Sequence, residues 1–153
     1  MRSRILLAVA ALLSVTAGPV CAAGIDEHPA DLQSIEALEA RATAAQPREQ
    51  CFLYAELVHQ MTELSLKEYA SGDIENANGM LKRIQKLAQK IHLAMAGNDK
   101  RLKNAEILLR HTALRLNEML HGSSYEDRPL LEETLAQINQ AQGEAMMQVF
   151  RNK

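Results

Sequence analysis

Apolar residues recur every three or four positions along most of this 153-residue chain. This period is typical of amphipathic helices, and no stretch shows the strict alternation of a half-buried strand. Glycine or proline interrupts the pattern at Pro47, Gly72, Gly97 and Gly122. The interruptions divide the chain into five segments. The sequence therefore predicts an all-α protein.

The first predicted helix, from Pro29 to about Ala45, is the shortest of the five. It carries apolar residues at helical spacing: Leu32, Ile35, Leu38 and Ala42. The second is expected to run from Pro47 to about Ala70 and to turn Glu63 toward solvent. Leu87 on the third helix and Leu109 on the fourth are predicted core residues.

Local signals mark where the helices end and begin. Gly72 is expected to end the second helix in the left-handed conformation, and Asp73 to cap the third helix through its carboxylate. Asn98 is expected to cap the fourth in the same way. Because the turns are only a few residues long, consecutive helices are expected to lie side by side and antiparallel. The predicted fold is an up-and-down antiparallel bundle of about four long helices in residues 47–153, with a shorter N-terminal helix in residues 23–46.

Residues 1–22 have the order of a bacterial secretory signal. Arg2 and Arg4 precede an apolar run, and Gly18-Pro19 and small residues follow it. The run has about 11 residues, whereas a membrane span needs roughly 20. We expect cleavage after Ala22, with a cut after Ala23 as the near alternative. The mature protein would then be periplasmic or secreted, with no transmembrane segment.

Removal of this signal would leave Cys51 as the single cysteine. An exported chain with one cysteine has no intrachain disulfide, so its stability must come from helix packing. We interpret Cys51 as a small buried apolar residue. A free thiol in an oxidising compartment leaves an intermolecular disulfide as the alternative.

Composition and motifs argue against catalysis. Hydrophobic residues make up 47% of the chain and aromatic residues 3%, with no Trp, so the core must be built from Leu, Ile, Ala and Met. The seven Met residues are interpreted mostly as core filling. The chain has no Gly-x-Ser-x-Gly, no His-Glu-x-x-His and no Gly-rich phosphate loop. We therefore expect neither enzymatic activity nor a cofactor.

Two histidines provide the alternative function. If the helices mirror one another about their turns, His59 and His111 lie at nearly the same height in the bundle. Imidazole ligands suit copper and haem iron. The alternative to a simple interaction protein is therefore a periplasmic metal- or haem-binding helical bundle.

Charge is unevenly distributed along the sequence. The whole chain is at −2, yet residues 82–115 hold nine Lys and Arg against Asp99 and Glu106, a net +7. This basic segment either pairs with the acidic helices or docks an anionic partner on the third and fourth helices. An anion site would use Lys100, Arg101 and Lys103, expected in the first turn of the fourth helix, where free backbone N–H groups attract anions. Nucleic acid is not expected as a partner, because the chain is exported, acidic and poor in aromatics. The sequence thus predicts a non-enzymatic exported protein that binds a protein partner or an anionic envelope surface.

Overall fold

Five helices account for most of the described chain. The computed structural model describes residues 30–95 and 101–151, and no strand occurs in these ranges, which confirms the all-α prediction. The helices are α1 Leu32–Ala44, α2 Pro47–Ser71, α3 Ile74–Met95, α4 Leu102–Gly122 and α5 Arg128–Arg151. The predicted signal segment, Pro29, Gly97, Asn98 and Lys100 lie outside the described residues. No helix in these ranges has both the length and the apolar character to cross a membrane.

Helix ends follow the local signals of the sequence where they are described. Gly72 closes α2 at a φ of 87°, a left-handed conformation that glycine adopts without a steric penalty. The carboxylate of Asp73 accepts a hydrogen bond from the backbone N–H of Asn76 at 3.2 Å, so it caps α3 as predicted. Pro47 occupies the first turn of α2. Helix α1 begins later than expected, because Asp31 caps it and α1 starts at Leu32.

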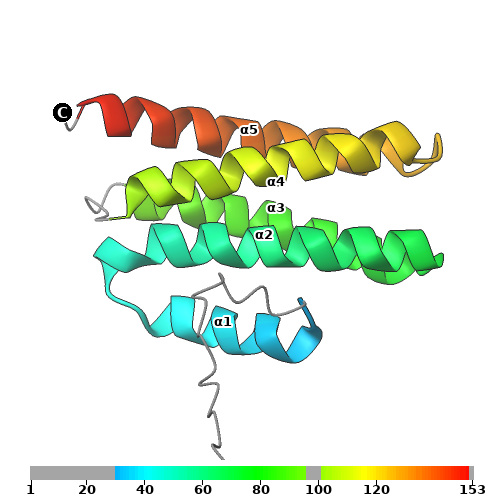
Figure 1. The fold of residues 1–153 in the computed structure, drawn as a ribbon, viewed down its shortest axis with the longest axis horizontal. Coiled ribbons are helices and arrows are strands. Elements are labelled where there is room, and N and C mark those ends of the chain that lie inside the picture. Colours follow the sequence, from blue (N-terminus) through cyan, green and yellow to red (C-terminus); the bar gives the residue numbers. More distant parts are fainter. Residues whose placement is uncertain (1–29, 96–100, 152–153) are drawn as a thin grey trace, which may run out of the picture.

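The four long helices run alternately up and down and enclose one core (Figure 1). Around that core their order is α2, α3, α5, α4. Within the described residues, neither α3 and α4 nor α2 and α5 pack along one another. Fully buried side chains of all four helices fill the interior, among them Leu57, Met61, Leu81, Ile84, Leu109, Leu116 and Ile138.

The expectation that all consecutive helices lie side by side is therefore wrong for α3 and α4. Six residues separate Met95 from Leu102, and six residues can reach about 20 Å. The diagonal of a bundle whose helices lie 8–10 Å apart is only about 11–14 Å. The connection is thus long enough to place α4 across the bundle from α3. The bundle consists of two antiparallel hairpins, α2–α3 and α4–α5, packed so that α2 runs parallel to α4 and α3 parallel to α5 (Figure 1).

Each neighbouring pair of long helices is joined by at least one polar contact that is wholly or partly buried. Four of these contacts are Ser65 Oγ to the Ala77 carbonyl at 3.1 Å, His59 Nδ1 to Thr112 Oγ1 at 3.3 Å, Gln85 Nε2 to Thr134 Oγ1 at 3.0 Å, and Gln142 Nε2 to Glu106 Oε1 at 2.8 Å. A buried polar atom without a partner is costly, so a shifted helix would lose these bonds. The contacts therefore help to set the register and the order of the helices.

Helix α1 lies against the outside of α2 (Figure 1). Ile35, Leu38 and Ala42 are buried as predicted, whereas Leu32 is exposed, so its assignment to the core was wrong. Leu32 is the first residue of α1, at the end of the helix, and 56% of its surface is exposed. Two ion pairs tie this short helix to the bundle: Arg41–Glu56 at 3.2 Å and Glu39–Arg83 at 2.7 Å.

Candidate functional site

His59 contacts α4 through Thr112. The Thr112 hydroxyl donates its proton to the carbonyl of Leu108 at 2.9 Å. The same hydroxyl oxygen lies 3.3 Å from Nδ1 of His59, within hydrogen-bond distance. The ring of His59 on α2 thus contacts α4 through its Nδ1 atom.

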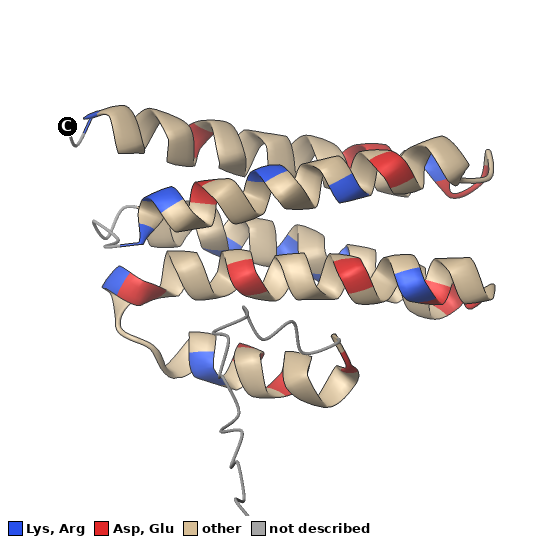
Figure 2. Cartoon of the chain, viewed as in Figure 1, with Lys and Arg blue, Asp and Glu red and all other residues tan. Residues whose placement is uncertain are grey.

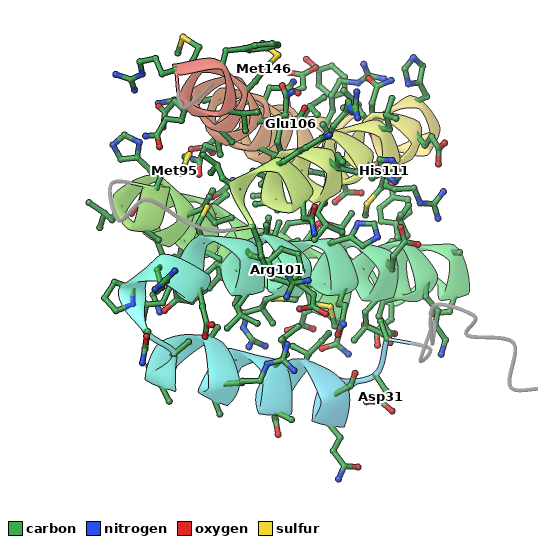
Figure 3. The ribbon with its side chains drawn as sticks, turned by 60° about the vertical axis from the view of Figure 1, so that its left-hand side comes forward. Asp31, Met95, Arg101, Glu106, His111 and Met146 are labelled. Atoms are coloured by element: carbon green, nitrogen blue, oxygen red, sulfur yellow. The ribbon has the colours of Figure 1, made fainter. Side chains whose placement is uncertain are left out.

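His111, labelled on α4 in Figure 3, does not join His59 in a site. His59 lies level with Thr112, the neighbour of His111, so the two histidines lie at similar heights. The side chain of His111 is exposed, however, and Thr112 occupies the position facing His59. Within residues 30–95 and 101–151, no three His, Cys, Asp or Glu side chains are arranged to hold a metal ion.

The side chain of Cys51 has no exposed surface. It lies in the first turns of α2 among the core residues. A disulfide with another chain would require the start of α2 to open, because the sulfur does not reach the surface in this fold. The structure agrees with the interpretation of Cys51 as a packed apolar residue.

The basic segment does not form one surface. Its residues belong to α3 and α4, which lie across the bundle from one another, and Figure 2 shows the Lys and Arg positions on separate helices. Arg83 pairs with Glu39 of α1, and Arg115 contacts Glu118 and pairs with Glu63 at 2.7 Å. Glu63 was expected to face solvent, but it is half-buried and links α2 to α4. The basic residues of α3 and α4 are therefore divided between helices that do not pack along one another in the described structure.

The proposed anion residues are only partly placed together. Lys100 lies outside the described residues, and Lys103 is exposed in the first turn of α4. Arg101 is the residue that precedes α4, and its guanidinium carbon lies 3.3 Å from the centre of the Phe52 ring on α2 (Figure 3). The side chain of Arg101 therefore packs on an aromatic ring of the bundle.

This stacking predicts different effects for two neighbouring cations. Arg101→Gln should lose a cation–π contact of about 0.5–1 kcal/mol. Both Arg101→Gln and Lys103→Gln should relieve a contact with the positive end of the helix dipole, typically 0.3–1 kcal/mol. We expect Lys103→Gln to melt at or slightly above the wild-type temperature and Arg101→Gln to melt below Lys103→Gln. Equal melting temperatures would mean that the stacking contributes nothing in solution.

A group of exposed apolar side chains lies elsewhere, at the end of the bundle where α3 and α5 finish. Leu93 is 74% exposed, Met147 60% and Phe150 65%. Two adjoining grooves of about 490 and 780 Å³ run between α3 and α5 and share His92, Leu93 and Glu144. We call the second of these the end groove, lined among others by His92, Leu93, Glu144, Met147, Phe150 and Arg151. Met95 and Met146, labelled in Figure 3, mark the same end of α3 and α5.

A hydrogen bond crosses the end groove. His92 Nδ1 donates to Glu144 Oε2 at 2.5 Å, and Gln140 donates to the other carboxylate oxygen of Glu144 at 3.1 Å. The hydrogen bond from His92 has the largest effect on Glu144 and lowers its pKa below the ordinary value. The hydrogen bond from Gln140 lowers the pKa further, whereas partial burial of the carboxylate raises it. Glu144 is therefore a carboxylate in the groove at neutral pH.

One feature of the sequence points to this groove, although helical periodicity alone does not reveal it: the last part of α5 has few charged residues. From Thr134 to Arg151 the only charged residues are Glu144 and Arg151, and Figure 2 shows this scarcity along α5. The sequence pattern favours methionine mostly as a core filler, but Met146 and Met147 are exposed. The pairing of this stretch with Leu93 depends on α3 and α5 being neighbours, which the sequence pattern does not reveal.

Comparisons with known proteins add no functional information. A scan against protein-family models, a search of curated proteins and a search of solved structures each found no match to this chain. The function must therefore be argued from the geometry of the chain itself.

Proposed function

We propose that this chain is an exported, non-enzymatic interaction protein of the bacterial envelope and that the end groove is its binding surface for a protein partner. The observation that carries this proposal is the cluster of exposed Leu93, Met147 and Phe150 around a groove. Contiguous exposed apolar surface is unfavourable in water and commonly marks an interaction site. Binding would remove these side chains from water.

The composition of the groove fits a protein partner better than an anionic surface. Protein interfaces are enriched in Met and aromatic residues and depleted of charge at their centre. The end groove has Met147 and Phe150, and its charged groups include both signs, Glu144 and Arg151. An anionic membrane would instead favour one continuous basic face, and the basic residues of α3 and α4 are divided between two sides of the bundle.

Crosslinking in cells tests the binding surface. A photoreactive amino acid replaces Met147 in the full chain, and the matched control carries it at Leu114, an apolar residue of α4 that is 59% exposed. We expect a crosslinked protein product from position 147 and none, or far less, from position 114. Equal yields would contradict the assignment. Binding of the purified protein to vesicles containing anionic lipid, with no protein crosslink, would replace this proposal with the membrane alternative.

N-terminal sequencing of the protein from separated cell fractions tests the proposed export. We expect the protein in the periplasmic or secreted fraction to begin at Ala23, or at Gly24 under the alternative cut. An N-terminus at Met1 in a cytoplasmic fraction would contradict it.

A further inference from the structure

We infer that the end groove binds the end groove of a second copy of this chain, through an antiparallel pair of α5 helices centred beside Met147. The inference rests on the proposed function, because it takes the end groove as the binding surface, and it adds the identity of the partner. A two-fold contact uses the same patch on both copies, so the patch must be complementary to itself. The end groove meets this condition in charge and in apolar surface.

Charge gives the direction of the pairing. Glu144 and Arg151 both line the end groove, and seven residues on a helix place them two turns apart on one face, about 10.5 Å along the axis. When a second α5 runs antiparallel and is centred between these residues, each Glu144 faces Arg151 of the other copy. A parallel pairing would place like charges opposite one another, which is unfavourable. Because these are the only charges of α5 after Glu133, no other charge of α5 within this overlap opposes the antiparallel arrangement.

The apolar residues match in the same register. Met147 lies midway between Glu144 and Arg151, close to the two-fold axis, so the two Met147 side chains would face one another. Leu93 follows His92, which bonds to Glu144, so Leu93 lies beside Glu144 along the bundle. In the antiparallel register, Glu144 of one copy lies at the level of Arg151 of the other. Leu93 lies at the level of Glu144, and Phe150 directly precedes Arg151. Leu93 therefore lies next to Phe150 of the second copy. One register thus covers all three exposed apolar residues of the groove.

The other cations of α3 do not disturb this contact. Lys82, Arg83 and Lys86 lie two turns or more before Leu93 on α3, outside the overlap. Lys90 is directed over the ring of Tyr54 on α2, at 5.5 Å from the ring centre. Three charged or titratable groups of the described residues line the end groove: His92, Glu144 and Arg151. Among these three, Glu144 and Arg151 face each other's counterparts in the second copy, and His92 contacts Glu144 of its own copy.

Sedimentation velocity of the protein purified from cells that express the full chain tests the dimer directly. We expect the mass to rise from monomer toward dimer as concentration increases. Met147→Asp would place two carboxylates at the axis and should abolish dimer formation, whereas Leu114→Asp, an equally drastic change on an exposed residue of α4, should leave it unchanged. Circular dichroism of both variants checks that they remain helical. A wild-type protein that stays monomeric at every concentration, or a dimer insensitive to Met147→Asp, would overturn the inference.

A charge exchange tests the register. Glu144→Arg alone places Arg residues opposite one another, and Arg151→Glu alone does the same with carboxylates, so each variant should dimerise roughly tenfold or more weakly than the wild type. Mixing the two variants restores both opposite-charge pairs, and the mixture should form the dimer that neither forms alone. A mixture that dimerises no better than its components would exclude this antiparallel register.

The crosslinking products separate this inference from the proposed function. A crosslinked product at position 147 with twice the mass of the chain supports both the proposed function and the second-copy inference. A product that contains a different protein supports the proposed function and overturns the second-copy inference. No product at position 147 contradicts both.

Discussion

Leu109→Ala is expected to lower the free energy of unfolding by about 2–5 kcal/mol, the range found when buried leucines are truncated. Leu109 is fully buried in the middle of α4. The substitution removes apolar contacts and leaves a cavity that the surrounding helices fill only in part. Chemical denaturation followed by circular dichroism measures the loss.

Leu114→Ala provides the matched control for this prediction. Leu114 lies on the same helix and undergoes the same chemical change, but it is exposed. We expect its truncation to alter the free energy of unfolding by less than about 0.5 kcal/mol. Similar losses for both variants would mean that the buried face of α4 is assigned incorrectly.

Asp127→Ala is expected to cost about 1–3 kcal/mol near neutral pH, because charge-assisted hydrogen bonds are stronger than neutral ones but Asp127 is only partly buried. The Asp127 carboxylate accepts hydrogen bonds from Ser124 at 2.7 Å, Asn78 at 3.0 Å and Tyr69 at 3.3 Å. These donors come from the connection before α5, from α3 and from α2. Removing the carboxylate breaks the hydrogen bonds that link these three parts of the fold at one end of the bundle.

The contribution of Asp127 should depend on pH in a defined direction. The hydrogen bonds, that of Ser124 most strongly, hold the pKa of Asp127 below its ordinary value of 3.8, against the opposing effect of burial. A lowered pKa in the folded state gives stability that is present above pH 3.8 and is lost as pH falls through the folded-state pKa. The difference between wild type and Asp127→Ala should therefore be constant near neutral pH and disappear in acid.

Glu126→Ala is the control for this pH series. Glu126 is the exposed neighbour of Asp127 in the same connection. Its removal should change stability by less than about 0.5 kcal/mol at any pH in the series. If Glu126→Ala and Asp127→Ala had equal effects, a general charge effect rather than the hydrogen-bonded network would explain the loss.

The sequence determined the parts of this protein that depend on neighbouring residues. Helical periodicity located the five helices, and the φ of 87° at Gly72 and the cap at Asp73 follow from steric freedom and side-chain length within a few residues. The buried positions of Leu87 and Leu109 follow from the same periodicity, because an amphipathic helix turns its apolar stripe toward the core. These features require no knowledge of which helices meet.

Only the tertiary structure decided the order of the helices and, with it, the candidate site. Periodicity shows that a helix has a buried face but not which helix covers it, and the connection from α3 to α4 is long enough for more than one arrangement. The order α2, α3, α5, α4 separated the basic residues of α3 and α4, turned Glu63 toward Arg115, and placed Thr112 rather than His111 against His59. The same order brought Leu93 beside Met147, more than fifty residues later in the chain, and so formed the end groove.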